Sequence, residues 1–342
     1  MRIMVTGHKG YIGVVLVPML LERGYDVVGY DSDLFRRCNY TAAPVEVPEI
    51  IKDIREISAE DLEGVDAVMH LAALSNDPLG NLNPGLTEDI NFKASYRVAE
   101  LCKERGVERF IFSSSCSNYG AAGEGWMTEE SPMNPVTAYG RSKVATEEAV
   151  KKIADDNFSP TFLRNATAYG HSCRIRFDLV INNLVAWAMT TKSIFIKSDG
   201  TPWRPVVHIE DISRAFIAAL EADRAKVHNE SFNIGRNDQN YQVRQIADLV
   251  KASITDANVD YAADGEPDKR SYRVDFSKVN DVLPEFQPQW TVAKGVEELK
   301  GIMTAHEIVV EEIEGERYQR VAHIRGLIGQ GVLDDTLRTI AI

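Results

Sequence analysis

The chain has 342 residues, 44% of them hydrophobic and 26% charged, so it can bury a large core, and the collagen-like, disulfide-scaffold and disordered classes are excluded. Because 51 acidic residues outnumber 38 basic ones, for a formal net charge of −13, we expect neither nucleic acid nor a membrane surface as a partner. The longest strongly apolar stretch, 14–21, is far shorter than the roughly 20 residues that span a bilayer, and four scattered cysteines favour reduced thiols in a cytoplasmic protein.

The first half of the chain alternates short β-branched runs with amphipathic stretches. This pattern is typical of βαβ units, in which a helix connects two parallel strands. It predicts an α/β protein with a doubly wound, Rossmann-type parallel sheet. The expected strands are 2–5, 26–30, 67–71, 109–113 and 161–164, and the expected helices are 11–23, 92–105 and 138–154.

The second half is less regular and predicts a smaller α/β lobe that binds the substrate. We expect a nucleotide-binding domain over 1–172, to which 201–238 return, and a lobe made of 173–200 and 239–342. Its C-terminal helical tail either caps the lobe or joins a dimer. The expected helices are 177–189, 211–222, 241–252, 294–305 and 316–328, and the expected strands are 193–196 and 230–234.

A glycine-rich segment, TGHKGYIG at 6–13, lies between the first expected strand and the first expected helix. Glycines at 7, 10 and 13 permit a tight turn and let backbone N–H groups approach a diphosphate. Asp31 ends the next strand, about 20 residues on, where a carboxylate accepts hydrogen bonds from ribose hydroxyls and repels a 2′-phosphate. The pattern therefore predicts NAD rather than NADP. Two alternatives are a purely structural turn and a 2′-phosphate held by Arg36 or Arg37.

Tyr139 and Lys143 lie four residues apart on an expected helix and therefore share one face. An ammonium group close to a phenol favours the phenolate, so the tyrosine can act as general base and then general acid. Serines 113–115 end an expected strand, where a hydroxyl would face the ligand crevice. The alternative is a tyrosine and a lysine on a solvated helix face, since such a pair also occurs by chance.

These motifs together resemble the extended short-chain dehydrogenase/reductases, specifically the NAD-dependent nucleotide-sugar epimerase/dehydratase group. The resemblance covers roughly residues 1 to 300, and it implies a tightly held NAD and a nucleotide-diphosphate sugar as substrate. It also implies a homodimer paired through helices of the nucleotide domain. The matching segments are TGHKGYIG, Asp31, HLAA at 70–73, SSSCSNYG at 113–120, YGRSK at 139–143, WRPVVHIEDI at 203–212 and FNIG at 232–235.

The resemblance also assigns roles to individual residues. Ser115, Tyr139 and Lys143 are the implied catalytic triad. The implied cofactor-binding residues are Gly7, Gly10, Tyr11, Ile12, Gly13, Asp31, Asp53, Ile54, Leu71, Ala72, Ala73, Asn91, Ser113, Tyr139 and Lys143. The implied substrate-binding residues are Ser75, Asn76, Ser115, Thr167, Asn183, Arg204, and Arg270 or Arg273, which would replace a late diphosphate-binding arginine of the family.

The residues after Ser115 discriminate among the chemistries of this family. Members that dehydrate or decarboxylate carry an acidic residue two positions after the catalytic hydroxyl, whereas this chain has Cys116 and Ser117. A related set that epimerises at two carbons uses a cysteine at that place, but Cys116 is one residue off. In an extended segment it should point away from the face that Ser115 and Ser117 share.

These residues favour a 4-epimerase, which oxidises the sugar at carbon 4, lets the 4-keto sugar rotate and reduces it on the other face. A reductase that consumes NAD(P)H with a 4-keto sugar is the main alternative. An NAD-binding regulator without activity is a third reading, but it would not need the serine, tyrosine and lysine together. The seven histidines show no paired ligand spacing, so we expect no metal.

Overall fold

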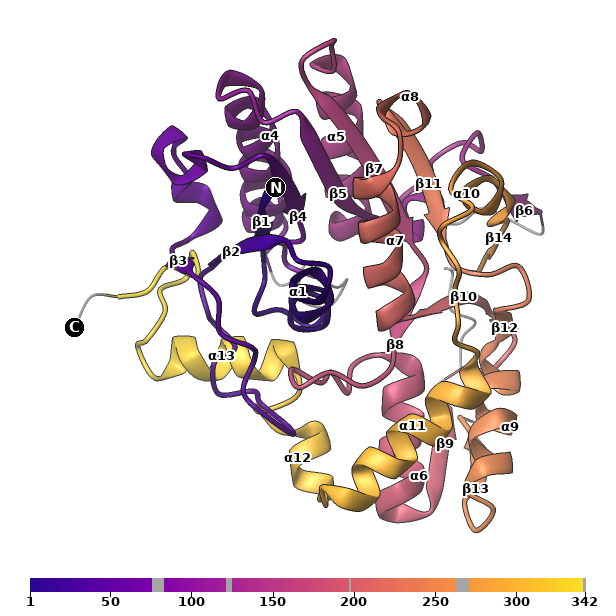
Figure 1. Ribbon diagram of the computed structural model, residues 1–342. Coiled ribbons are helices and arrows are strands. Elements are labelled where there is room, and N and C mark those ends of the chain that lie inside the picture. The colour runs from indigo at the N-terminus through magenta and orange to yellow at the C-terminus, as the bar shows by residue number, and fades with distance from the viewer. Residues whose placement is uncertain (76–82, 121–124, 197, 263–270, 341–342) are drawn as a thin grey trace.

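The computed structural model describes residues 1–75, 83–120, 125–196, 198–262 and 271–340 (Figure 1). At its centre lies a seven-stranded sheet of parallel strands in the order β11-β7-β5-β4-β1-β2-β3. The strands are β1 (Arg2–Thr6), β2 (Asp26–Asp31), β3 (Glu49–Ile51), β4 (Ala67–His70), β5 (Arg109–Ser115), β7 (Ser159–Asn165) and β11 (Glu230–Ile234). The five strands expected in the first half are all present, and the short edge strand β3 was not predicted.

Helices cover both faces of this sheet, as Figure 1 shows. On one face lie α1 (Gly13–Glu22) and α7 (Ile209–Glu221), and on the other α4 (Ala94–Glu104) and α5 (Ala138–Lys152). Side chains of β1 alternate between the two cores, with Ile3 and Val5 in one and Met4 in the other. The prediction of a doubly wound α/β sheet is therefore confirmed. The strand order reverses beside β1, so the ligand crevice is expected where β1 and β4 end.

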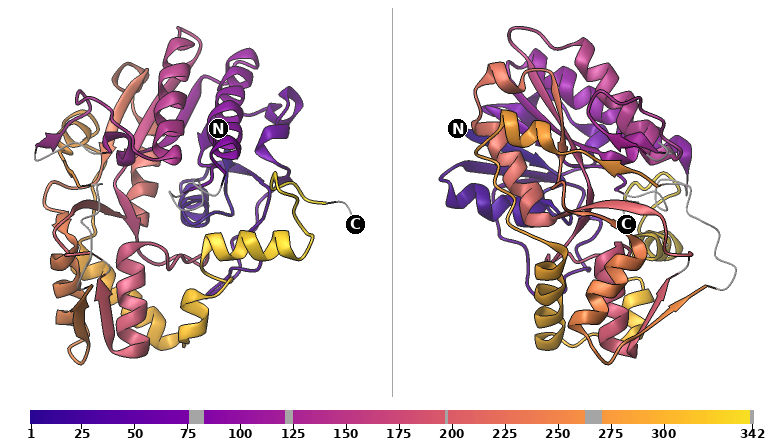
Figure 2. Two further views of the ribbon diagram at one scale, coloured as in Figure 1. Left: turned by 180° about the vertical axis from the view of Figure 1, so that it is seen from behind. Right: turned by 90° about the vertical axis from the view of Figure 1, so that its right-hand side faces the viewer.

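A smaller lobe with its own core lies beside this domain (Figure 2). Its strands are β8 (Thr167–Tyr169), β10 (Trp203–His208) and β12 (Asn240–Gln242) in one sheet, and β9 (Ser193–Ile196) with β13 (Asn258–Tyr261) in another. Its helices are α6 (Val180–Thr191), α9 (Val243–Ser253), α11 (Val292–Ala305) and α12 (Val310–Glu314). No helix in the described part of the chain has both the length and the apolar character needed to cross a bilayer.

Two late segments, which the sequence assigned to the lobe, pack instead against the nucleotide domain. Val274 and Phe276, from β14 (Arg273–Val274) and the turn after it, share a core with α1 and α7. The helix α13 (Arg320–Gly329) and Leu337 share the other core with α4 and α5. The remaining short elements are β6 (Trp126–Met127), α3 (Pro84–Thr87), α8 (Arg224–Val227), α10 (Ser277–Val282), a π-helical turn Glu88–Lys93 and the 3-10 turns Ile54–Glu56, Ala59–Leu62 and Cys116–Tyr119.

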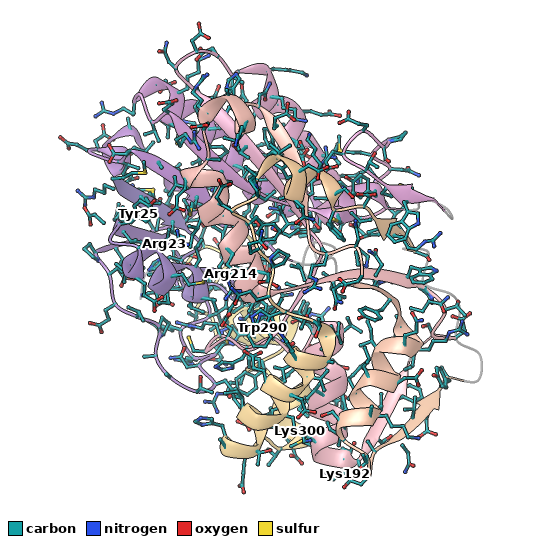
Figure 3. All side chains as sticks on the ribbon, turned by 45° about the vertical axis from the view of Figure 1, so that its right-hand side comes forward. Arg23, Tyr25, Lys192, Arg214, Trp290 and Lys300 are labelled. Atoms are coloured by element: carbon teal, nitrogen blue, oxygen red, sulfur yellow. The ribbon has the colours of Figure 1, made fainter. Side chains whose placement is uncertain are left out.

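The segment just before α11 is hydrogen-bonded to the first turn of α7, so the lobe and the nucleotide domain are joined at this point. The buried Asp211 accepts hydrogen bonds from the backbone N–H groups of Gln289 and Trp290, both at 2.9 Å. The Trp290 indole stacks on His208 with 3.8 Å between ring centroids. Figure 3 shows Trp290 and Arg214 near this junction, where Arg214 pairs with Asp211 at 2.7 Å.

His70, at the end of β4, is fully buried and makes folding sensitive to acid. Its Nδ1 lies 2.7 Å from Thr6 Oγ1 and its Nε2 lies 2.8 Å from Ser95 Oγ. Burial lowers the pKa of His70 from 6.5 to about 3. The unfolded chain therefore binds a proton below pH 6.5 that the folded chain does not. The contribution of His70 to stability is complete above pH 6.5 and is lost as pH falls toward 3, by about 2 kcal/mol at pH 5.

We expect a His70→Gln variant to show a smaller fall in the free energy of unfolding between pH 7 and pH 5 than the parent protein. Urea denaturation at the two pH values measures this difference. His306→Gln, at an exposed position, serves as the control and should keep the parental pH dependence. Equal pH dependence in the His70 variant and the parent would contradict the assignment.

Candidate active site

The loop between β1 and α1 has no room for a Cβ at Gly7 or Gly13. Gly7 has φ +74°, and a Cβ on it would lie 2.8 Å from the backbone nitrogen of Ala72. A Cβ on Gly13 would lie 2.4 Å from the carbonyl oxygen of Gly7. No side chain caps the N-terminus of α1. The loop thus brings β1, β4 and the start of α1 together and leaves backbone N–H groups for an anion, as a dinucleotide diphosphate requires.

Asp31 ends β2 beside this loop, and its carboxylate is oriented by the backbone. Its Oδ2 accepts a hydrogen bond from Lys9 N at 3.0 Å and its Oδ1 accepts one from Asp33 N at 2.8 Å. Burial raises the pKa of this carboxyl group. Since a carboxylate can accept about four hydrogen bonds, positions remain for two ribose hydroxyls. Loop and carboxylate together fit a dinucleotide such as NAD.

One cavity of about 440 Å³ extends from this loop, along the carboxyl ends of the strands, to the lobe. It brings together most of the residues that the sequence singled out. Those that line it are Gly7, Gly10, Tyr11, Ile12, Gly13, Asp31, Asp53, Ile54, Leu71, Ala72, Ala73, Ser75, Ser113, Ser115, Tyr139, Lys143, Thr167 and Arg204.

Three expected site residues do not line the cavity. Asn91 is fully buried and bonds the backbone of Leu74, accepting from its N–H at 2.8 Å and donating to its carbonyl at 3.1 Å, so it supports the loop after β4. Asn183 donates to the carbonyl of Phe177 at 2.7 Å. The guanidinium of Arg273 lies over two indole rings, those of Trp126 and Trp203. Asn76 and Arg270 lie outside the described residues.

Lys143 is the most deeply buried member of the expected triad. Its Nζ donates to the carbonyl of Ser113 at 2.7 Å and lies 5.7 Å from the ring centroid of Tyr139. Burial lowers the pKa of Lys143 to about 7. Thr137 caps α5 by accepting from Gly140 N at 3.1 Å, which fixes the turn that carries Tyr139. Ser115, Tyr139 and Lys143 thus line the same cavity.

Behind the triad lies a buried ion pair that the sequence did not reveal. Glu147, one turn after Lys143 on α5, pairs with Arg164 of β7 at 2.8 Å, and both side chains are nearly inaccessible. Glu147 also accepts hydrogen bonds from the Ser114 hydroxyl and, at 2.9 Å, from the Asn118 amide. This network joins α5 to the ends of β5 and β7. In the sequence, Tyr139, Lys143 and Glu147 follow one another at intervals of four residues, which places them on one face of the helix. This spacing was the sequence signal for Glu147.

Cys116 points away from the cavity, as the alternation of side chains predicted. Ser115 and Ser117 line the cavity, whereas the buried Cys116 thiol donates to the carbonyl of Arg164 at 3.1 Å. Burial raises the pKa of this thiol well above its ordinary value. Cys116 is therefore a core residue rather than an acid facing the cavity.

Several residues that line the cavity were not predicted from the sequence. Arg176 and Asp178, just before α6, form a pair at 2.7 Å, and Arg176 also donates to the Ser75 hydroxyl at 3.2 Å across the cavity. Other unpredicted lining residues come from late in the chain, and among them are Tyr272, Arg320, Ile324 and Leu337. The charged residues of the segment RIRFD at 174–178 were a sequence signal for a binding site. No local pattern in the C-terminal tail indicated that it would reach this cavity.

Comparisons with known proteins agree with this geometry. The model of the family described as "NAD dependent epimerase/dehydratase family" matches residues 3–235. The UDP-glucose 4-epimerase of Corynebacterium glutamicum is 30% identical over 268 residues, which cover 73% of this chain and 80% of that protein. A crystal structure of UDP-glucuronic acid 4-epimerase from Bacillus cereus, with UDP-glucuronic acid and NAD bound, is 26% identical, with a TM-score of 0.74 over 89% of this chain and 99% of that one.

An NAD-dependent NDP-hexosamine 5,6-dehydratase superimposes with a TM-score of 0.79 over 90% of this chain and 98% of that one. At 23% identity it is evidence for the shared fold alone. The matched family model and the NAD in the Bacillus cereus structure confirm NAD as the cofactor. With its glycine loop, Asp31 and the matched segment 3–235 taken together, this chain belongs to the NAD-dependent epimerase/dehydratase family.

Proposed function

We propose that this protein is an NAD-dependent nucleotide-sugar 4-epimerase. The observation that supports the proposal is that Ser115, Tyr139 and Lys143 line the cavity that the glycine loop also lines. The glycine loop and Asp31 would hold NAD, which would supply reversible acceptance of a hydride from carbon 4 of the sugar. The chain's own residues move the proton and orient the sugar.

In this proposal Tyr139 removes the proton of the 4-hydroxyl as general base and returns it to the 4-keto oxygen as general acid. Ser115 donates a hydrogen bond to the same oxygen, and its Oγ is oriented by accepting from Ser117 N at 3.1 Å. The ammonium of Lys143 favours the phenolate of Tyr139. A lysine whose pKa is about 7 changes protonation near neutral pH, which suits its place beside a proton-transferring phenol.

The distribution of carboxylates favours epimerisation over dehydration. Within the described lining of the cavity, the carboxylates are Asp31, Asp33, Asp53 and Asp178. The first three belong to the nucleotide-binding side, and Asp178 is paired with Arg176. None of them lies two positions after Ser115, where a dehydratase of this family places its acid.

Arg204 and Thr167 are the proposed contacts of the substrate's diphosphate. They line the lobe end of the cavity from the neighbouring strands β10 and β8. A guanidinium group suits phosphate oxygens because it donates two parallel hydrogen bonds. The UDP-sugars named for the relatives support a nucleotide-diphosphate sugar as substrate.

The proposal is tested by incubating the purified protein with nucleotide sugars deuterated at carbon 4, without added cofactor, and separating the products by chromatography. We expect the 4-epimer to form with the deuterium retained at carbon 4 and with no net NADH. Stoichiometric consumption of NAD(P)H with a 4-keto sugar would instead identify a reductase. Loss of water from the substrate would identify a dehydratase.

A further inference from the structure

The helix α13 crosses the carboxyl edge of the central sheet, next to the segment that follows β2 (Figures 1 and 2). His323 anchors it there, with Nε2 2.9 Å from the carbonyl oxygen of Leu34. Ile324 of this helix and Leu337 beyond it are buried and line the cavity. A segment near residue 320 thus forms part of the lining of the cavity that the glycine loop at 7–13 also lines.

Arg320, the first residue of α13, is 3% exposed and lines this cavity. Its guanidinium lies 4.2 Å from the centre of the Phe35 ring, and its Nη2 donates to the carbonyl of Arg174 at 3.0 Å. Its Nη1 is buried and has no hydrogen-bond partner. Within the described residues no carboxylate forms an ion pair with Arg320.

The surroundings of Arg320 carry an excess of positive charge. Arg174 and Arg176 are also buried, and they pair with Asp33 at 3.2 Å and with Asp178 at 2.7 Å. Three guanidinium groups therefore face two carboxylates. Burial and the nearby Arg176 lower the pKa of Arg320 to about 10. A buried cation with unused N–H groups is unfavourable unless an anion completes its hydrogen bonds.

We propose that Arg320 binds the diphosphate of NAD from the side opposite the glycine loop, so that α13 is part of the cofactor site. The cofactor is the favoured source of the anion because Arg320 stacks on Phe35, four residues after the ribose-side carboxylate Asp31. The proposed contacts of the substrate's diphosphate, Arg204 and Thr167, belong to the lobe strands β10 and β8 instead. Closure of the site by α13 would slow the release of NAD between turnovers.

The test compares Arg320→Met and Arg320→Lys with the parent protein, and Arg325→Met serves as a matched control. Arg325 is an arginine on the same helix, but it is exposed. NAD that remains bound after repeated gel filtration is extracted and quantified, and the Kd of NAD for the stripped protein is measured by calorimetry. We expect Arg320→Met to raise the Kd of NAD about 10- to 100-fold, because charge-assisted hydrogen bonds are lost.

Arg320→Lys should raise the Kd by less, since lysine keeps the charge but lacks the planar fork. Arg325→Met should match the parent, and the Kd of UDP should be the same in every variant. The proposal is overturned if Arg320→Met changes the Kd of NAD less than twofold, or weakens UDP instead.

Thermal unfolding separates binding from a merely structural role. We expect the Tm of stripped Arg320→Met to equal or exceed that of the stripped parent, because a buried charge is removed, while the rise in Tm on adding NAD shrinks. If stripped Arg320→Met instead has a lower Tm than the stripped parent, and added NAD raises the Tm of both proteins equally, Arg320 has a role in folding rather than in binding. If Arg320→Met does not fold, the rate of NAD release from Arg320→Lys is compared with that from the parent, and this comparison tests the proposal. The inference rests on NAD as cofactor and not on the sugar chemistry, so failure of the 4-epimerase assay leaves it intact.

Discussion

Replacement of Tyr139 by phenylalanine is expected to lower kcat by about 10³-fold, within the range that a positioned general acid–base contributes. Phenylalanine keeps the ring and its packing but lacks the hydroxyl that would move the proton of the sugar alcohol. Because the Thr137 hydroxyl caps this turn by accepting a hydrogen bond from Gly140 N, α5 should stay in place. Initial rates with a 4-epimeric pair of nucleotide sugars measure the loss.

Bound NAD provides the control for this variant. Its content should stay close to that of the parent, since the glycine loop, Asp31 and Lys143 are unchanged and phenylalanine keeps the ring of Tyr139. A second control is Tyr25→Phe, just after the C-terminal end of α1 (Figure 3), where the hydroxyl donates to Glu221 at 3.1 Å. That change should leave kcat unaltered. Turnover of Tyr139→Phe within tenfold of the parent would rule out Tyr139 as the base.

Replacement of Glu147 by leucine is expected to lower the free energy of unfolding by about 3–5 kcal/mol. Both Glu147 and Arg164 are buried, with side chains 1% and 3% exposed, so removing the carboxylate leaves an uncompensated cation in the core. The Ser114 hydroxyl and the Asn118 amide lose a partner at the same time. Urea denaturation at pH 7 gives the change.

Two further variants make this result specific. Glu148→Leu, at the adjacent exposed position, should change stability by less than about 0.5 kcal/mol. The double variant Glu147→Leu with Arg164→Met should be less destabilised than the sum of the single changes, because neither charge is left alone. If Glu147→Leu were no less stable than Glu148→Leu, the ion pair would have no structural importance.

The parts of the site that were predictable from the sequence depend on local spacing. The glycines at 7, 10 and 13 lie in one turn between a strand and a helix, and Tyr139 and Lys143 lie one helical turn apart. Such patterns reflect steric and helical constraints that operate within about 20 residues. The direction of Cys116 was also predictable, because side chains alternate along an extended segment.

The parts that were not predictable depend on contacts between distant segments. Arg273 was an expected diphosphate ligand, yet pairing of β14 with β6 brings it over Trp126, about 150 residues earlier in the chain. Arg320 was not predicted as a site residue, because the amphipathic pattern of the tail indicates a helix but does not indicate which surface that helix covers. Asn91 and Asn183 lie close to the site, but their amides bond to backbone groups of neighbouring turns.

The position of α13 has a consequence for how the protein is made. His323 contacts Leu34 across 289 positions of the chain, so a ribosome completes the glycine loop and the central sheet long before it synthesises this helix. Contacts of such separation form late because a long loop must close first. A nascent chain should therefore expose an open, freely exchanging nucleotide crevice. With α13 in its proposed role, the finished polypeptide would bind its dinucleotide more tightly than the nascent chain.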